Sequence, residues 1–211
     1  WQPLVGASAG CYLVSLLEGR LQSPTADGRA ASLGLRLEAQ AWAVGVLQFD
    51  LAAACRLGDD GVELVRQFLA SSLESQFAEP VLVESCFLAE NQIGVLFLCH
   101  DGERTKLTLR INQNGQKVLT GLERRFGVRA SLGIGCIKDS LDDVPASLRS
   151  ARDALALGFN QPDAPGLRFA EPGLRRVQCG KPTGADATLV SLVKMADREG
   201  AQAQLAAMFA E

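Results

Sequence analysis

The chain of 211 residues contains a single histidine, His100, and no two of its cysteines have Cys-x-x-Cys spacing. Zinc sites are built from histidine and cysteine side chains at short, regular spacings, so no zinc site is expected here. The six cysteines stand at positions 11, 55, 86, 99, 136 and 179, most of them in apolar stretches. We therefore expect reduced, buried cysteines in a cytoplasmic protein, and neither a metal nor another cofactor.

The sequence also lacks long apolar runs and an excess of positive charge. No apolar stretch reaches the roughly 18 residues that a membrane span needs, and no charged leader precedes one. The formal net charge is −3, too little positive charge for the segment to bind duplex DNA by itself. What remains is an ordinary globular composition, and the first residue, Trp1, indicates a piece of a longer protein.

Apolar periodicity predicts alternating strands and helices between residues 41 and 170. The expected strands are 41–51, 81–89, 93–100, 128–137 and 166–173, and the expected helices are 61–77, 101–126 and 142–158. The order is therefore β-α-β-β-α-β-α-β. A split β-α-β unit around a hairpin is typical of a ferredoxin-like α+β fold, whose helices we expect on one face of an antiparallel or mixed sheet.

Helical periodicity continues outside this core. Residues 7–21 place Cys11, Val14, Leu17 and Leu21 on one face, residues 28–39 form a short second helix, and helices resume from about residue 185. Each terminal helix has two alternatives: to fold back on its own sheet, or to pair with the same helix of a second chain. The polar break at 198–200 divides the last helix, which favours a weak homodimer.

The stretch VRASLGIGC, followed by SLRSARDALALG, resembles the closing strand and helix of GGDEF-type nucleotidyl cyclase domains. It is more similar to the degenerate GGDEF-like domains of bacterial AraC-type response regulators and of sugar-diacid and purine-catabolism regulators. The shared features are a Ser-x-Gly-x-Gly strand and an Ala-Arg-x-Ala-Leu helix. The resemblance implies a nucleotidyl cyclase-like sandwich at 39–172, a helical segment at 1–38, and a helical connector at 173–211 toward a missing DNA-binding domain.

The same resemblance locates the place where an active GGDEF domain holds its metal and nucleotide. The hairpin tip here reads ENQIG (90–94), with Gln92 at the Asp position, Ile93 at the Glu position and no glycine pair. The first strand offers Gln48-Phe49-Asp50 in place of Asp-x-Asp, and the inhibitory Arg-x-x-Asp is replaced by VLVE (81–84). Amides do not neutralise a divalent cation, so we expect a turn and not a catalytic loop.

Two readings of these residues stay open. A register shifted by two would make Asp50 a metal ligand and Glu90 a second carboxylate, although nothing would then replace the glycines. Asp50 is otherwise expected to be a strand-end or cap residue, or a polar group in a vestigial pocket. If a ligand site survives, we expect it at Gln48, Asp50, Glu90, Asn91 and Gln92, where amides suit a small neutral ligand such as a sugar.

The sequence thus predicts a non-catalytic regulatory domain of a bacterial AraC-type transcriptional regulator, which senses or transmits a signal and helps the protein dimerise. DNA would be contacted only through the missing C-terminal domain, and no membrane is involved. One alternative is a domain that makes or binds a nucleotide or cyclic dinucleotide. Another is a structural spacer that binds no ligand.

Overall fold

The computed structural model describes residues 7–21, 28–77, 80–157 and 166–170, all of which belong to one compact unit, residues 1–172. The helices predicted from residue 185 onward, and with them the connector at 173–211, lie outside the described residues. No helix within the described ranges has the length and apolar character to cross a bilayer.

The centre of the fold is a five-stranded sheet in the order β2-β3-β1-β4-β5. Its strands are β1 (Ala41–Phe49), β2 (Val81–Ala89), β3 (Gln92–Cys99), β4 (Ala130–Ile134) and β5 (Leu167–Phe169). Strand β3 is antiparallel to both β1 and β2, β4 is antiparallel to β1, and β5 is parallel to β4. This is the split β-α-β arrangement, so the predicted α+β, nucleotidyl cyclase-like fold is confirmed.

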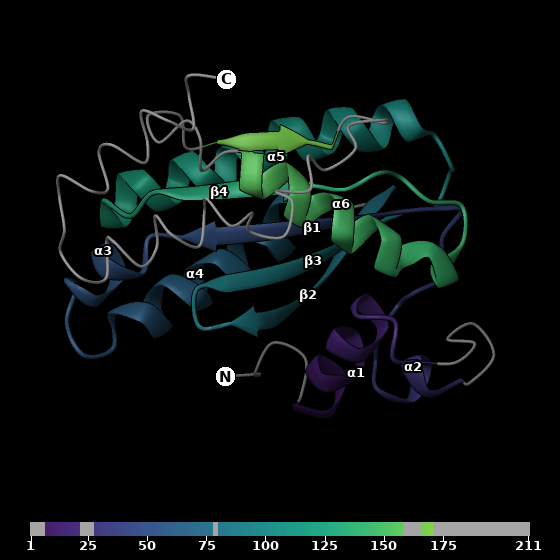
Figure 1. The fold of residues 1–211 in the computed structure, drawn as a ribbon, viewed down its shortest axis with the longest axis horizontal. Coiled ribbons are helices and arrows are strands. Elements are labelled where there is room, and N and C mark those ends of the chain that lie inside the picture. The colour runs from purple at the N-terminus through teal and green to yellow at the C-terminus, as the bar shows by residue number, and fades with distance from the viewer. Residues whose placement is uncertain (1–6, 22–27, 78–79, 158–165, 171–211) are drawn as a thin grey trace, which may run out of the picture. The chain divides into compact units, whose positions relative to one another are not determined.

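Helices cover both faces of the sheet, and the expectation that they would lie on one face was wrong (Figure 1). Helices α4 (Gly61–Gln76) and α5 (Arg104–Phe126) bury one face, and α1 (Ala7–Leu17) and α6 (Val144–Leu157) bury the other. The signal for this was in β1, which is apolar along nearly its whole length. Leu47 packs into one core and Val46 into the other, as expected for a strand that is buried on both sides.

Helix α1 folds back onto its own sheet, which was one of the two alternatives for this segment. Its buried residues are Ala9, Tyr12, Leu13, Leu16 and Leu17. The predicted apolar face was wrong at Cys11, which is exposed, and Val14 and Leu21 are only partly buried. The predicted and the observed buried residues both have helical spacing, so periodicity alone could not show which face of α1 is buried. In the structure, the face with the larger side chains packs into the core.

The helix ends agree with the sequence at some points and differ at others. Gly127, with φ of 66°, ends α5 as predicted. Helix α5 begins at Arg104 and not at Asp101, whose side chain accepts a hydrogen bond from the Glu103 amide. The second helix is shorter than expected, α2 (Arg29–Ser32), and its predicted cap, Asp27, lies outside the described residues.

The cysteines are free thiols in the described part of the chain, but not all of them are buried. Cys86 and Cys99 are buried, whereas Cys11 and Cys55 are exposed, so the prediction was wrong at these two positions. Burial, and then the nearby Glu18 carboxylate, raises the pKa of the Cys86 thiol to about 12. Cys86 is therefore a packing residue, not a nucleophile.

Candidate ligand site at the hairpin tip

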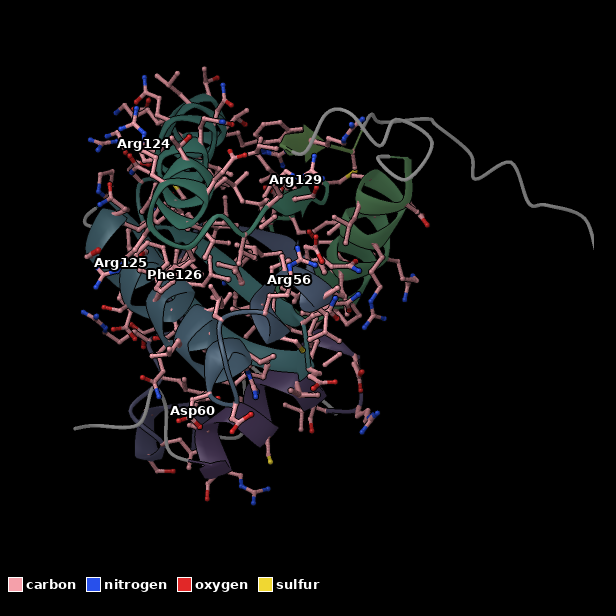
Figure 2. All side chains as sticks on the ribbon, turned by 90° about the vertical axis from the view of Figure 1, so that its left-hand side faces the viewer. Arg56, Asp60, Arg124, Arg125, Phe126 and Arg129 are labelled. Carbon is pink, nitrogen blue, oxygen red and sulfur yellow. The ribbon has the colours of Figure 1, made fainter. Side chains whose placement is uncertain are left out.

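One end of the sheet brings together the β2–β3 turn, the end of β1 and the start of β4. The turn consists of Glu90 and Asn91. In the sheet, Gln48 of β1 lies opposite Gln92 of β3 on one side and opposite Ser131 of β4 on the other. The residues predicted as a candidate site therefore share one small region, and Figure 2 views the fold from this end.

The two glutamines form a direct hydrogen bond across the strands. The Gln92 Nε2 donates to Gln48 Oε1 at 3.2 Å, and both side chains are partly buried. An amide pair can bond in this way because each amide carries both a donor and an acceptor. Two carboxylates at the same place would only accept and would repel each other unless a cation lay between them.

Asn91 holds the turn against the end of β1. Its Nδ2 donates to the Phe49 carbonyl at 3.0 Å, and the Phe49 amide donates to the Asn91 carbonyl at 3.2 Å. The side-chain donor of Asn91 is thus used inside the protein. Glu90, in contrast, is exposed and makes no hydrogen bond or ion pair with the described residues.

Asp50 begins a short helix that the sequence did not predict, α3 (Leu51–Cys55). Its Oδ1 accepts a hydrogen bond from the Ala53 amide at 3.0 Å, and its own amide donates to the Arg129 carbonyl at 2.9 Å. This is the geometry of a helix N-cap. The interpretation of Asp50 as a cap residue is therefore confirmed, and whether it also contacts a ligand stays a prediction.

Replacement of Asp50 tests this structural role. Asp50→Ala should lower the free energy of unfolding by about 1 kcal/mol, because the Ala53 amide loses its acceptor. Asp50→Asn is the matched control: its side-chain oxygen caps as well, so its stability should stay close to that of the unmodified protein. Urea unfolding of the three proteins measures both values. Equal losses for both variants would show that the carboxylate charge, and not the cap, is what stabilises this end.

Two arginines at this end were not singled out from the sequence. Arg56 follows α3, and Arg129 precedes β4 and bonds Asp50 through its backbone. Both side chains are exposed, and neither forms a salt bridge with any residue in the described ranges (Figure 2). Single arginines that lie far apart in the sequence form no recognisable motif. Only the fold shows that these two lie at the end of β1, together with the predicted site.

No group of three or more His, Cys, Asp or Glu side chains is arranged to hold a metal ion among the residues that the structure describes. His100 and Asp101 follow the other end of β3, away from the hairpin tip. Asp101 Oδ1 accepts from the Cys99 thiol at 2.9 Å and from the Glu103 amide at 3.1 Å. The thiol hydrogen bond is the main cause of the lowered pKa of Asp101.

Fold and site together define a nucleotidyl cyclase-like domain whose hairpin tip is closed by amide hydrogen bonds. The GGDEF-like domain family matches residues 18–157, about two thirds of the sequence, and the chain belongs to this family. No curated protein sequence matches it significantly.

Solved structures give similar but distant matches. The GGDEF domain of DgcB from Caulobacter crescentus, in complex with c-di-GMP, is 13% identical, with a TM-score of 0.49 over 69% of this chain and 84% of that chain. The GGDEF domain of TpbB (YfiN) from Pseudomonas aeruginosa is 22% identical, with a TM-score of 0.47 over 74% and 88%. That of FimX from the same organism is 16% identical, with a TM-score of 0.46 over 79% and 96%. At these values the similarity supports no conclusion about activity.

Proposed function

We propose that this chain is a non-catalytic regulatory domain of a bacterial AraC-type transcriptional regulator. The hydrogen bond between Gln48 and Gln92 is the observation that carries the proposal. It joins the two positions where the family's active members are expected to place acidic residues. A domain that has lost these acids keeps its fold for another purpose, such as sensing a ligand, transmitting a signal or dimerising.

The residues at the hairpin tip do not fit a divalent metal. Asp50 is the carboxylate that directly follows β1, and one of its oxygens already accepts from the Ala53 amide. Gln48 and Gln92 bond each other, and Asn91 donates to the Phe49 carbonyl. Hard cations such as Mg²⁺ need several oxygen ligands and negative charge close to the nucleotide phosphates. The shifted register, with Asp50 and Glu90 as ligands, would supply carboxylates but leave the neutral amides between them.

The regulator context is supported by the strand-helix motif of the sequence. Ser131 and Gly133 of the Ser-x-Gly-x-Gly motif lie on β4, Gly135 follows it directly, and the Ala-Arg-x-Ala-Leu residues lie on α6. By resemblance, such domains stand between a sensory or receiver domain and a DNA-binding domain. The full-length gene product tests this directly: paired helix-turn-helix motifs after residue 211 are expected, and their absence would remove the AraC assignment.

The proposed ligand site consists of Gln48, Asp50, Glu90, Asn91 and Gln92. Amides that both donate and accept suit the hydroxyl groups of a neutral sugar. The unpaired guanidinium groups of Arg56 and Arg129 lie at the same end, so sugar acids form a second group of test compounds. The alternative is a nucleotide site, which would use the same arginines for phosphate.

Thermal unfolding with these compounds decides between the alternatives. A sugar present at 100 times its Kd should stabilise the protein by about 2.7 kcal/mol, which raises the melting temperature by roughly 5–11 °C. Gln92→Met keeps the side-chain length but removes the amide, and it should abolish the shift. Gln67→Met, on the exposed surface of α4, is the control and should leave the shift unchanged. A shift with GTP and Mg²⁺ but with no sugar would replace this proposal by the nucleotide alternative, and no shift at all would favour a structural spacer.

A further inference from the structure

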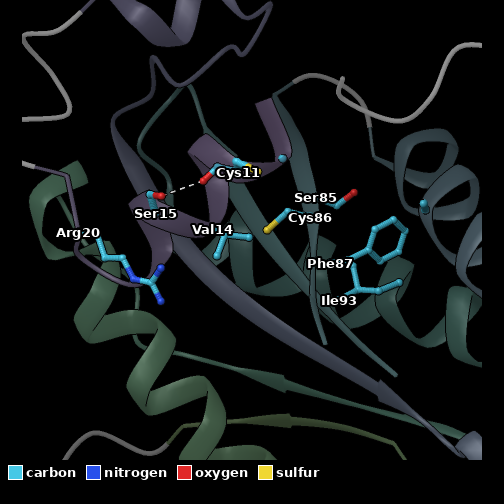
Figure 3. Close-up of a pocket in the computed structure, with 10 residues that line it drawn as sticks. Cys11, Val14, Ser15, Arg20, Ser85, Cys86, Phe87 and Ile93 are labelled. Atoms are coloured by element: carbon cyan, nitrogen blue, oxygen red, sulfur yellow. Dashed lines mark hydrogen bonds between the residues drawn. The ribbon is translucent and has the colours of Figure 1, made fainter. Parts of the chain in front are cut away.

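A groove with a volume of about 380 Å³ runs along the outer edge of the sheet. One wall is α1, with Cys11 and Val14, and the other includes Ala70 of α4; between them lie Ser85, Cys86 and Phe87 of β2. Figure 3 shows Cys86 pointing toward Val14 and Phe87 pointing to the opposite side of the strand. The floor of the groove is thus the edge strand itself.

Every second residue of β2 turns its backbone N–H and C=O groups outward, away from β3. In an antiparallel pair, hydrogen-bonded and non-hydrogen-bonded residues alternate. The His100 amide donates to the Pro80 carbonyl at 3.1 Å, and the same register continues through the pairs Leu82–Leu98, Glu84–Leu96 and Cys86–Gly94. The even-numbered residues of β2 therefore bond to β3. The N–H and C=O groups of Val83, Ser85 and Phe87 point outward, and no partner for them lies in the described part of the chain.

This edge lacks the usual protection against strand pairing. Exposed edge strands are commonly short, or carry prolines or several charges. The opposite edge follows this rule, since β5 has only 3 residues. Strand β2 has 9 residues, VLVESCFLA, with no proline and one charged side chain, Glu84. Its one irregularity lies between Phe87 and Ala89, close to the hairpin tip.

We propose that the β2 edge binds the β2 edge of a second copy of this chain, antiparallel and centred on Ser85. In this register Ser85 lies opposite Ser85, and Val83 opposite Phe87, so all three outward residues form hydrogen-bonded pairs. Glu84 lies opposite Cys86 of the second copy. A register centred on Glu84 would instead place two carboxylates directly opposite each other, which is unfavourable.

The walls of the groove fit the same arrangement. The two-fold axis would stand perpendicular to the sheet, so both α1 helices would lie on the same side and approach each other. The groove side of α1 carries small residues, and a methyl group added at Gly10 would meet no atom within 4 Å. Cys11, which periodicity wrongly assigned to the core, and the partly buried Val14 would then be covered by the second copy.

This interface does not depend on the proposed regulatory role, and it differs from the dimer that the sequence predicts through residues 185–209. Sedimentation equilibrium of the whole chain separates the two possibilities. Ser85→Pro removes only an outward N–H, a position where proline is tolerated on an edge strand. We expect the dimer dissociation constant to rise at least about tenfold in Ser85→Pro, and to stay unchanged in the control Ser85→Ala. Leu192→Asp, which targets the helix that the sequence predicts from residue 185 onward, should have no effect.

Amide hydrogen exchange gives a second measurement that does not need the proline variant to fold. The amides of Val83, Ser85 and Phe87 should become protected as protein concentration rises, whereas those of Leu82, Glu84 and Cys86 should be protected at every concentration. Ser85→Lys, which places two ammonium groups face to face, should abolish the concentration dependence. A strict monomer at the highest concentration, or a dimer that only Leu192→Asp dissociates, would overturn the proposal.

Discussion

Gly135→Ala is expected to destabilise the domain by about 3 kcal/mol or more, because α6 lies directly on the backbone of β4 and of Gly135, the residue after it. A Cβ atom at Gly135 would stand 2.0 Å from the Ser147 carbonyl oxygen, and one at Gly133 would stand 2.4 Å from that of Ala151. These are backbone atoms of a helix, which cannot turn aside as the end of a side chain can. The Ser147 hydroxyl also accepts from the Val44 amide at 2.9 Å, so moving α6 away would leave a buried donor unpaired.

Gly121→Ala is the matched control for this prediction. Gly121 lies within α5, where an added Cβ would come no closer than 3.4 Å to the ring of Phe68. Alanine is favoured over glycine in a helix by up to about 1 kcal/mol, so this variant should be as stable as the unmodified protein or slightly more stable. Urea unfolding measures both variants. A Gly135→Ala protein within 1 kcal/mol of the unmodified one would mean that α6 does not pack on β4 as described.

The cause of this contact is local, and its signal is visible in the sequence. Glycines that alternate within a strand allow close approach of a helix, and the small residues Ala151 and Ala154 recur on the helix that follows. Both alanines are buried in the structure. The order of strands and helices along the chain followed from the periodic segments, and it indicated the split β-α-β arrangement that the structure has.

Other features depend on contacts between distant residues and left no such signal. Helix α3 has only 5 residues, too few to show a period, and it exists because Asp50 caps it and Arg129 holds it. The bond from Asn91 to Phe49 spans 42 positions in the chain. The helices α1 and α6 were predicted, but their place on the second face of the sheet was missed. The strand β1 was interpreted as buried without the consequence that both of its faces need cover.

We also expect that this domain does not turn over nucleotides as active GGDEF-type domains do. Turnover of a nucleotide by a GGDEF-type domain depends on carboxylates that hold a divalent metal against the phosphates, as the resemblance implies. By the same resemblance, Gln48 and Gln92 stand at those places, and the two side chains bond each other at 3.2 Å. The turn residues are Glu90 and Asn91, where the resemblance implies a glycine pair that lets the backbone approach the nucleotide. Gln48→Asp together with Gln92→Asp should therefore not restore activity, because the turn remains unchanged.

The most direct test of a non-catalytic domain is an assay of nucleotide turnover by the purified chain. The protein is incubated with GTP, and separately with ATP, in the presence of Mg²⁺ or Mn²⁺, and the products are separated by chromatography. An active diguanylate cyclase under the same conditions is the positive control. We predict that the nucleotides remain unchanged over the full time course, with both metals. A cyclic product that accumulates with time, and that Asp50→Asn abolishes, would contradict the account and restore a catalytic role to the hairpin tip.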